Sequence, residues 1–461
     1  MRVFIASLLL ATTTAAAAQP NSPDAAAITA PRSITLRDAI SYARVHQPSL
    51  AAARARVEVA RGEAQVPRAA WSPRVTAGAE LLVGTNNNTT ASYGGPLGFD
   101  VPRIGGTPAN AKTSLSPDPS TLAGVGVRQE VYDFGRITAQ TDALDLFARA
   151  ADEDAETADL DLVLFVEESF YAVHGAHEVE QAASAAVKRA QEHRDFANAN
   201  VKAQLRPPIE LTRAEADLAR RQADEVRAEG ALRAAQQVLA AAIGAPDPAL
   251  DAGTDDVAYA PPPTVDLGNL DRRIPSLRAA IDALRGQQAL TKAISAELRP
   301  DLSLSAGVTG RAGGATVTTN PTPAGAGWVP DVPNWDALVV FSWPLFDRTV
   351  DARADVSRRL ERVRAAEVDA EREQLRAKIA GAYEELEVAE KALPALQRAV
   401  DAATDNQKQA DARFGQGLGT AVELADAEAL LTDTQIQLAV GQFQRARARA
   451  RLARVIAEVV P

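Results

Sequence analysis

The sequence has no cysteine, and only four of its 461 residues are histidine. Disulfide bonds, thiolate metal sites, cysteine nucleophiles and a lipid-modified N-terminal cysteine are therefore excluded. No apolar run reaches the roughly 20 residues that a membrane-spanning helix needs. The formal net charge of −11 also disfavours nucleic-acid binding, because such binding needs a basic surface that displaces the cations around phosphate groups.

Residues 1–18 have the pattern of a cleaved secretory signal. Arg2 precedes an apolar stretch at 3–10, and small residues follow up to an Ala-x-Ala sequence at 16–18. The apolar stretch has about half the length of a membrane anchor. We therefore expect export, with a mature protein that begins near Gln19 and resides in the periplasm, the outer membrane or the medium of a bacterium.

The rest of the chain repeats itself. Four landmarks occur in the same order in both halves: Pro-Ser-Leu at 48–50 and 275–277, a proline at 73 and 300, Phe-x-Arg at 134–136 and 346–348, and Glu-Leu-x-x-Ala at 210–214 and 423–427. This order indicates a duplicated architecture. Residues 33–243 and 271–461 are predicted to be two repeats, each with the order helix, strand, strand, helix, helix, and residues 244–270 a linker between them.

The hydrophobic pattern alternates with period two after each of these prolines. In residues 75–83 and 302–308 every second side chain is apolar, which is typical of a strand with one apolar face. Returning strands are predicted at 122–132 and 337–346. Each strand has about ten residues, the length that a tilted strand needs to cross a bilayer.

The connections within the strand pairs are long and polar. Residues 84–121 and 311–334 are rich in Gly, Asn, Thr and Pro, which suits loops on the outer face of a membrane barrel. Indole rings favour the interface between bilayer and water. Four tryptophans lie at the two ends of the strand region: Trp328 and Trp335 at one, Trp71 and Trp343 at the other. The alternative is that these rings fill an ordinary core.

The remaining segments are predicted to be helical. Residues 136–204 and 348–413 contain almost no helix-breaking signals, and as helices each would span roughly 100 Å. In the second run, apolar residues step alternately by four and three, which is the pattern of a coiled-coil seam. Shorter partner helices are predicted at 209–243 and 420–459.

Four strands cannot close a barrel alone. Open strand edges leave backbone groups without hydrogen bonds in hydrocarbon, and the smallest membrane barrels have about eight strands. Two or more copies must therefore share one barrel, and the residues alone permit a dimer, a trimer or a larger ring. The predicted fold class is an α+β membrane protein with a shared transmembrane β-barrel and very long α-helices that form a coiled-coil tunnel.

In their order, these features resemble the TolC-type outer-membrane efflux proteins. The resemblance runs from about Ile34 to Val459 and includes the pattern Arg-Phe-x-x-Gly-x-x-Thr-x-x-Glu-Leu-x-x-Ala at 413–427. It implies a homotrimer with four strands per subunit in one outer-membrane barrel, and a periplasmic tunnel that closes at its tip. The implied partners are a periplasmic adaptor protein, an inner-membrane pump and outer-membrane lipid. No cofactor and no metal ion are expected.

By the same resemblance, acidic residues just after the helix turns form the constriction at the tunnel tip. These positions are Glu423 and Asp426 in the second repeat, which share one helix face, and Glu210 in the first. Three subunits would bring these carboxylates together near the axis, where they would attract cations. The alternative is that each acid is an ordinary first-turn residue stabilised by the helix dipole.

The resemblance also implies that the turns contact the adaptor. The residues concerned are Gln204, Leu205, Arg206, Gly415, Gly417, Leu418 and Gly419. The bonds that close the tip do not transfer from relatives, because Gly419 stands where some of them carry an arginine and the first turn lacks the usual glycine. Ordinary turn chemistry is the other interpretation of these residues.

Two other classes of protein fit parts of the sequence. His174 and His177 could share a helix face in a zinc site, but the sequence lacks the His-Glu-x-x-His order of a metalloprotease, a nucleophile elbow and a phosphate-binding loop. An enzyme is therefore not expected. A periplasmic coiled-coil adaptor would also be exported and helical, but it has no use for four alternating strands. The sequence predicts a passive outer-membrane duct of a tripartite efflux or type I secretion system, for drugs, metal ions or polypeptides.

Overall fold

The computed structural model describes residues 33–85, 92–93, 101–102, 117–245, 250–253, 270–313 and 332–457. Its main elements follow the same order twice. The first series is α1 (Leu36–His46), α2 (Pro48–Ala69), β2 (Arg74–Thr85), β5 (Pro117–Tyr132), α3 (Arg136–Lys202) and α4 (Pro208–Ile243). The second is α5 (Leu270–Arg273), α6 (Pro275–Ala296), β7 (Asp301–Gly313), β8 (Val332–Ser342), α7 (Arg348–Gly415) and α8 (Ala421–Val455). The described residues also form the short strands β1 (Ser33–Ile34), β3 (Ser92–Tyr93), β4 (Val101–Pro102) and β6 (Asp251–Ala252).

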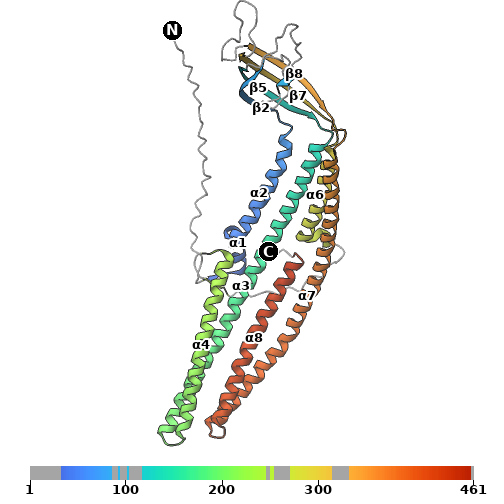
Figure 1. Ribbon diagram of the computed structural model, residues 1–461. Coiled ribbons are helices and arrows are strands. Elements are labelled where there is room, and N and C mark those ends of the chain that lie inside the picture. The colour runs from blue at the N-terminus through green and yellow to red at the C-terminus, as the bar shows by residue number, and fades with distance from the viewer. Residues whose placement is uncertain are drawn as a thin grey trace, which may run out of the picture.

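Two helices run from the sheet to the far end of the molecule (Figure 1). α3 has 67 residues and α7 has 68, which makes each about 100 Å long and confirms the two long helices predicted from the sequence. α4 folds back along α3 and α8 along α7, so that two hairpins point away from the sheet (Figure 1). Within the described ranges, no helix is long and apolar enough to cross a membrane.

The helices pack through small side chains and two apolar clusters. Alanine dominates the buried positions along α3 and α8, which allows close approach of the helix backbones. One cluster joins α1 to α3 and the C-terminal end of α4 around Phe170 and Ile243. The other joins α5 and α6 to α7 and α8 around Leu277 and Leu452. Most of the predicted linker at 244–270 lies outside the described residues; β6 within it pairs in parallel with β1.

The four long strands form one antiparallel sheet in the order β2, β5, β7, β8. The pairing of β5 with β7 joins the two repeats. At its centre, Gly124 lies opposite Thr309, and a Cβ at Gly124 would come within 2.8 Å of the Thr309 methyl carbon and 2.9 Å of the Val308 carbonyl oxygen. The repeats therefore meet at a point where only glycine leaves enough room for the neighbouring strand.

The sheet has one apolar and one polar face, as its period-two pattern requires. The apolar face exposes large side chains on all four strands: Val75, Leu81 and Val83 on β2, Val125 on β5, Leu304 and Val308 on β7, and Trp335, Val339 and Phe341 on β8. The polar face carries arginine, glutamate, serine and threonine side chains, of which Ser303, Ser305 and Thr309 are buried. Exposed apolar surface of this extent marks contact with a partner or a membrane.

Both outer edges of the sheet are open. Within the described residues, β2 and β8 each pair with a strand on one side only. The sheet in a single chain is therefore a curved segment and not a closed barrel (Figure 1). The predicted loops at 84–121 and 311–334 lie largely outside the described residues, and so does Trp328.

Candidate functional site

The first hairpin turn joins α3 to α4. Gln204 has a left-handed backbone (φ 60°) that redirects the chain after α3. The N–H of Leu205 donates to the carbonyl oxygen of Asn200 at 2.9 Å, a bond that satisfies the open C-terminus of a helix. Pro207 is the N-cap of α4 and Pro208 its first residue, where the fixed φ of proline favours the helix.

The second turn joins α7 to α8 with the same backbone geometry. Gly417 takes the left-handed position (φ 76°), and the N–H of Leu418 donates to the carbonyl oxygen of Arg413 at 2.9 Å. Gly415 is the exposed last residue of α7. Gln204 thus adopts in the first turn the conformation that Gly417 adopts in the second, although the left-handed region costs a residue with a Cβ roughly 1–2 kcal/mol.

Each turn has one exposed apolar side chain, and the other turn residues pack differently. Leu205 is 72 % exposed and Leu418 is 70 % exposed, so each turn offers one apolar side chain to a partner. Arg206 is partly buried, with its guanidinium carbon 5.7 Å from the centre of the Phe414 ring. Gly419 is buried, and a Cβ there would lie 3.2 Å from the Phe414 amide nitrogen. A larger residue at this position would require its neighbours to shift by a few tenths of an ångström.

The acidic residues predicted for the aperture begin the helices that follow the turns. Glu423 completes a capping box, because its carboxylate accepts the Thr420 N–H at 3.1 Å while its own N–H donates to the Thr420 hydroxyl at 3.2 Å. Asp426 is exposed on α8. Glu210 forms an ion pair with Arg206 at 3.2 Å. Glu423 therefore stabilises the start of α8 while its side chain stays exposed.

A buried polar cluster, not expected from the sequence, lies where the two hairpins meet. Arg189 of α3, Glu428 of α8 and Phe414 of α7 line a cavity of about 200 Å³ together with His193. The Arg189 guanidinium donates to the Thr432 hydroxyl at 3.1 Å. The rings of His193 and Phe414 meet edge to face, with their centres 5.1 Å apart. This cluster links α3 to both helices of the second hairpin.

Burial changes the ionisation of the cluster. It raises the pKa of Glu428 from 4.5 to about 7, although the nearby Arg189 guanidinium acts in the opposite direction. Burial also lowers the pKa of Arg189 and that of His193. Near neutral pH, Glu428 is therefore poised to gain or lose a proton at the contact between the hairpins.

One signal in the sequence points to this cluster. Leu424, Ala427 and Leu431 form the apolar stripe of α8, and Glu428 lies on the same stripe. A carboxylate on a buried stripe is a candidate for a shifted pKa. The corresponding residue of the first repeat, Glu215, is exposed, so that the internal duplication alone gives no reason to single out Glu428.

The other predicted residues lie on separate parts of the molecule. Trp335 is 78 % exposed and Trp343 is 55 % exposed, so neither fills the core of this subunit; Trp71 follows the C-terminal end of α2. The Nε2 atom of His174 lies 2.8 Å from the Gly253 carbonyl oxygen, and His177 lies beside Glu180. Across the described part of the chain, no three histidine or acidic side chains are placed to hold a metal ion.

Comparison with known proteins decides the family. A sequence model described as "Outer membrane efflux protein" matches residues 39–245 and 268–458, most of the chain. The chain belongs to the outer membrane efflux protein family. This efflux channel subunit is therefore not the periplasmic adaptor that the sequence left as an alternative. A search of curated proteins finds no match.

The fold of the efflux channel subunit is also that of solved outer-membrane channels. It superimposes on the Campylobacter jejuni channel CmeC with a TM-score of 0.75 at 14 % identity, over 91 % of this chain and 85 % of CmeC. The open state of Neisseria gonorrhoeae MtrE gives 0.71 at 21 % identity, over 91 % and 88 %. Vibrio cholerae VceC gives 0.70 at 18 % identity, over 91 % and 95 %. Likeness at these identities establishes the fold.

Proposed function

We propose that three copies of the chain close one outer-membrane barrel and one periplasmic tunnel, and act as the passive duct of a tripartite efflux or type I secretion system. The open edges of the sheet carry this proposal. Because unpaired edges are not tolerated in hydrocarbon, β8 of one copy pairs with β2 of the next until the ring closes. Three copies supply twelve strands, which agrees with the resemblance to TolC-type channels.

The two-faced sheet supports this arrangement. In a closed ring the apolar face with Val75, Leu304 and Trp335 contacts lipid, and the polar face with Arg74 and Arg128 lines the lumen. Trp71, Trp343, Trp335 and Trp328 belong to the membrane interfaces in this arrangement. The helices continue the duct into the periplasm, with their hairpin turns at its far end (Figure 1).

The turns are the proposed contacts with a periplasmic adaptor protein. In this arrangement, an inner-membrane pump delivers solutes to the duct through the adaptor. Leu205 and Leu418 are the exposed apolar side chains that such a partner would cover. The flanking turn residues are Gln204, Arg206, Gly415, Gly417 and Gly419. Exposed apolar side chains at matched positions of the two turns favour contact with a partner protein over a role in forming the turns alone.

Glu423, Asp426 and Glu210 are the proposed acidic aperture. Isosteric replacement of Glu423 and Asp426 by Gln and Asn tests this role, because glutamine at the third helical position preserves the capping box. In planar bilayers, we expect the double variant to lose cation selectivity and block by divalent cations. Glu229→Ala removes an exposed carboxylate of α4 far from the turns and serves as the control. A double variant that conducts with unchanged selectivity and block would refute the aperture.

A further inference from the structure

Two arginines face each other on the polar side of the sheet, at its end nearest the helices. The register pairs Arg74, the first residue of β2, with Arg128 of β5. Like charges directly opposite each other on neighbouring strands repel and destabilise the sheet. Within the described residues, neither guanidinium takes part in an ion pair or a hydrogen bond.

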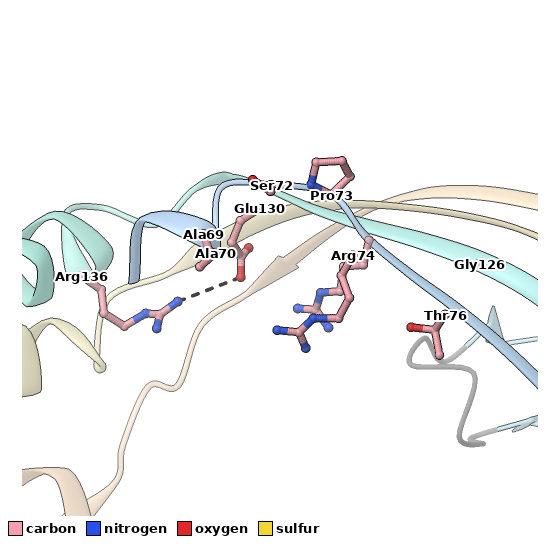
Figure 2. A pocket seen from close by; sticks show the side chains of 10 residues that line it. Ala69, Ala70, Ser72, Pro73, Arg74, Thr76, Gly126, Glu130 and Arg136 are labelled. Carbon is pink, nitrogen blue, oxygen red and sulfur yellow. Dashed lines mark ion pairs between the residues drawn. The ribbon is translucent and has the colours of Figure 1, made fainter. Parts of the chain in front are cut away.

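Both arginines line a cavity of about 600 Å³ between the sheet, the end of α2 with the turn that follows it, and the first residue of α3. Arg74 and Thr76 of β2, Glu130 of β5 and Arg136 of α3 line this space (Figure 2). Gly126 lies opposite Thr76 in the neighbouring strand and leaves that part of the wall without a side chain. The cavity is therefore large enough for a small solute, and both arginines belong to its wall.

The charge of this cavity is not balanced by its own residues. Glu130 is its one acidic lining residue, and its carboxylate lies 4.0 Å from the guanidinium of Arg136. That pair leaves the positive charges of Arg74 and Arg128 uncompensated in a chain whose net charge is −11. A guanidinium offers paired N–H donors that match the oxygens of phosphate and carboxylate groups. The Ser72 and Thr76 hydroxyls add further donors at the same cavity.

We propose that Arg74 and Arg128 form an anion-binding site at the periplasmic end of the barrel lumen, which takes phosphate or carboxylate groups of transported solutes. This inference rests on the proposed trimeric channel, because closure of the ring places the polar face in the lumen. The apolar face lies on the other side of the sheet, so the anion comes from the duct and not from lipid. In a trimer, three such sites form a basic band between the acidic tip and the exterior.

Inorganic pyrophosphate is a suitable probe, and isothermal titration calorimetry on the detergent-solubilised protein at low ionic strength measures its binding. We expect saturable binding to the unmodified protein, and a dissociation constant at least about tenfold higher for the double variant Arg74→Gln and Arg128→Gln. Arg227→Gln, which removes an exposed arginine of α4, is the matched control and should bind as the unmodified protein does. Equal binding by the double variant, or no binding by the unmodified protein, overturns the proposal.

The mass and the conductance of the same preparation separate this inference from the proposed function. A conducting trimer in which pyrophosphate added to the periplasmic side blocks the current, with block lost in the double variant, supports both. A conducting trimer without binding refutes the anion site and leaves the channel intact. A monomer without conductance refutes both the channel and a site in its lumen, whatever its affinity for pyrophosphate.

Discussion

Replacement of Glu428 by glutamine tests whether a buried carboxyl group controls the contact between the hairpins. The side chain is 8 % exposed and lies on the face of α8 that packs against α3. Charged and polar groups surround it on every neighbouring helix: Arg189, Glu192 and His193 on α3, Asp217 and Arg221 on α4, and Asp411 on α7. Glutamine keeps the shape of a protonated glutamate and cannot ionise, so it removes only the titration.

The direction of the effect follows from the raised pKa. The folded protein holds the proton of Glu428 with a pKa of about 7, whereas the unfolded chain holds it with the ordinary value of 4.5. The resulting stabilisation is complete below the unfolded pKa and is lost as the pH rises through 7. Its full size is about 3 kcal/mol. His193, whose pKa is lowered by burial, contributes in the opposite direction as the pH falls below 6.5.

Hydrogen exchange measures the local opening free energy of α3 and α8 near the turns. We correct the exchange rates for intrinsic exchange and compare the opening free energies of the unmodified protein and the Glu428→Gln variant. Between pH 5 and pH 8, the opening free energy of the unmodified protein should decrease relative to that of the variant by up to about 3 kcal/mol. This comparison cancels the contribution of His193. The control is Glu215→Gln, the exposed counterpart in the first repeat, which should leave the pH profile unchanged. Parallel profiles for the Glu428→Gln variant and the unmodified protein would refute a shifted pKa at this site.

Two further substitutions test the backbone geometry. Gly417→Ala should destabilise the α7–α8 turn by about 1–2 kcal/mol through its left-handed φ alone, since nothing lies within 4 Å of the new Cβ. The control is Gly415→Ala, whose Cβ would lie in equally open space but on a helical residue. Measured by the same hydrogen exchange, this variant should not destabilise the turn. Gly124→Ala should force β5 from β7 at a cost of about 1–3 kcal/mol and lower the temperature at which the oligomer dissociates in detergent. Ala77→Val, on the exposed face of β2, is the control and should leave that temperature unchanged. Equal temperatures for the Gly124→Ala variant and the unmodified protein would show that the pairing of β5 with β7 does not need the glycine.

Periodicity in the sequence was sufficient to predict the main elements. The long helices and the four strands follow from spacings of 3.6 and two residues, which act locally and survive in the fold. The first turn shows where local reasoning reaches its limit. Gln204 stands where glycine is usual, yet it adopts the left-handed conformation. The hydrogen bond from the Leu205 N–H to the Asn200 carbonyl oxygen and the prolines at the start of α4 fix the chain on both sides of it.

The sequence gives only one signal of the buried cluster, the position of Glu428 on the apolar stripe of α8, and none of the arginine pair, because both depend on contacts between distant segments. Glu428 and Glu215 occupy matching positions in the two repeats, but only Glu428 is covered by a neighbouring helix. Arg74 and Arg128 become opposite neighbours through the register of β2 and β5. A shift of that register by two residues would keep both arginines on the polar face but no longer opposite each other, and the period-two pattern does not distinguish these registers.

The most direct test of the account is the mass of the purified protein in detergent, measured together with its single-channel conductance in a planar bilayer. The central claim is that copies of this chain join β8 to β2 and close a conducting barrel. We predict a mass of three chains and a steady, cation-selective conductance. A monomer without conductance would contradict the claim, because the open edges of the sheet would then remain unpaired.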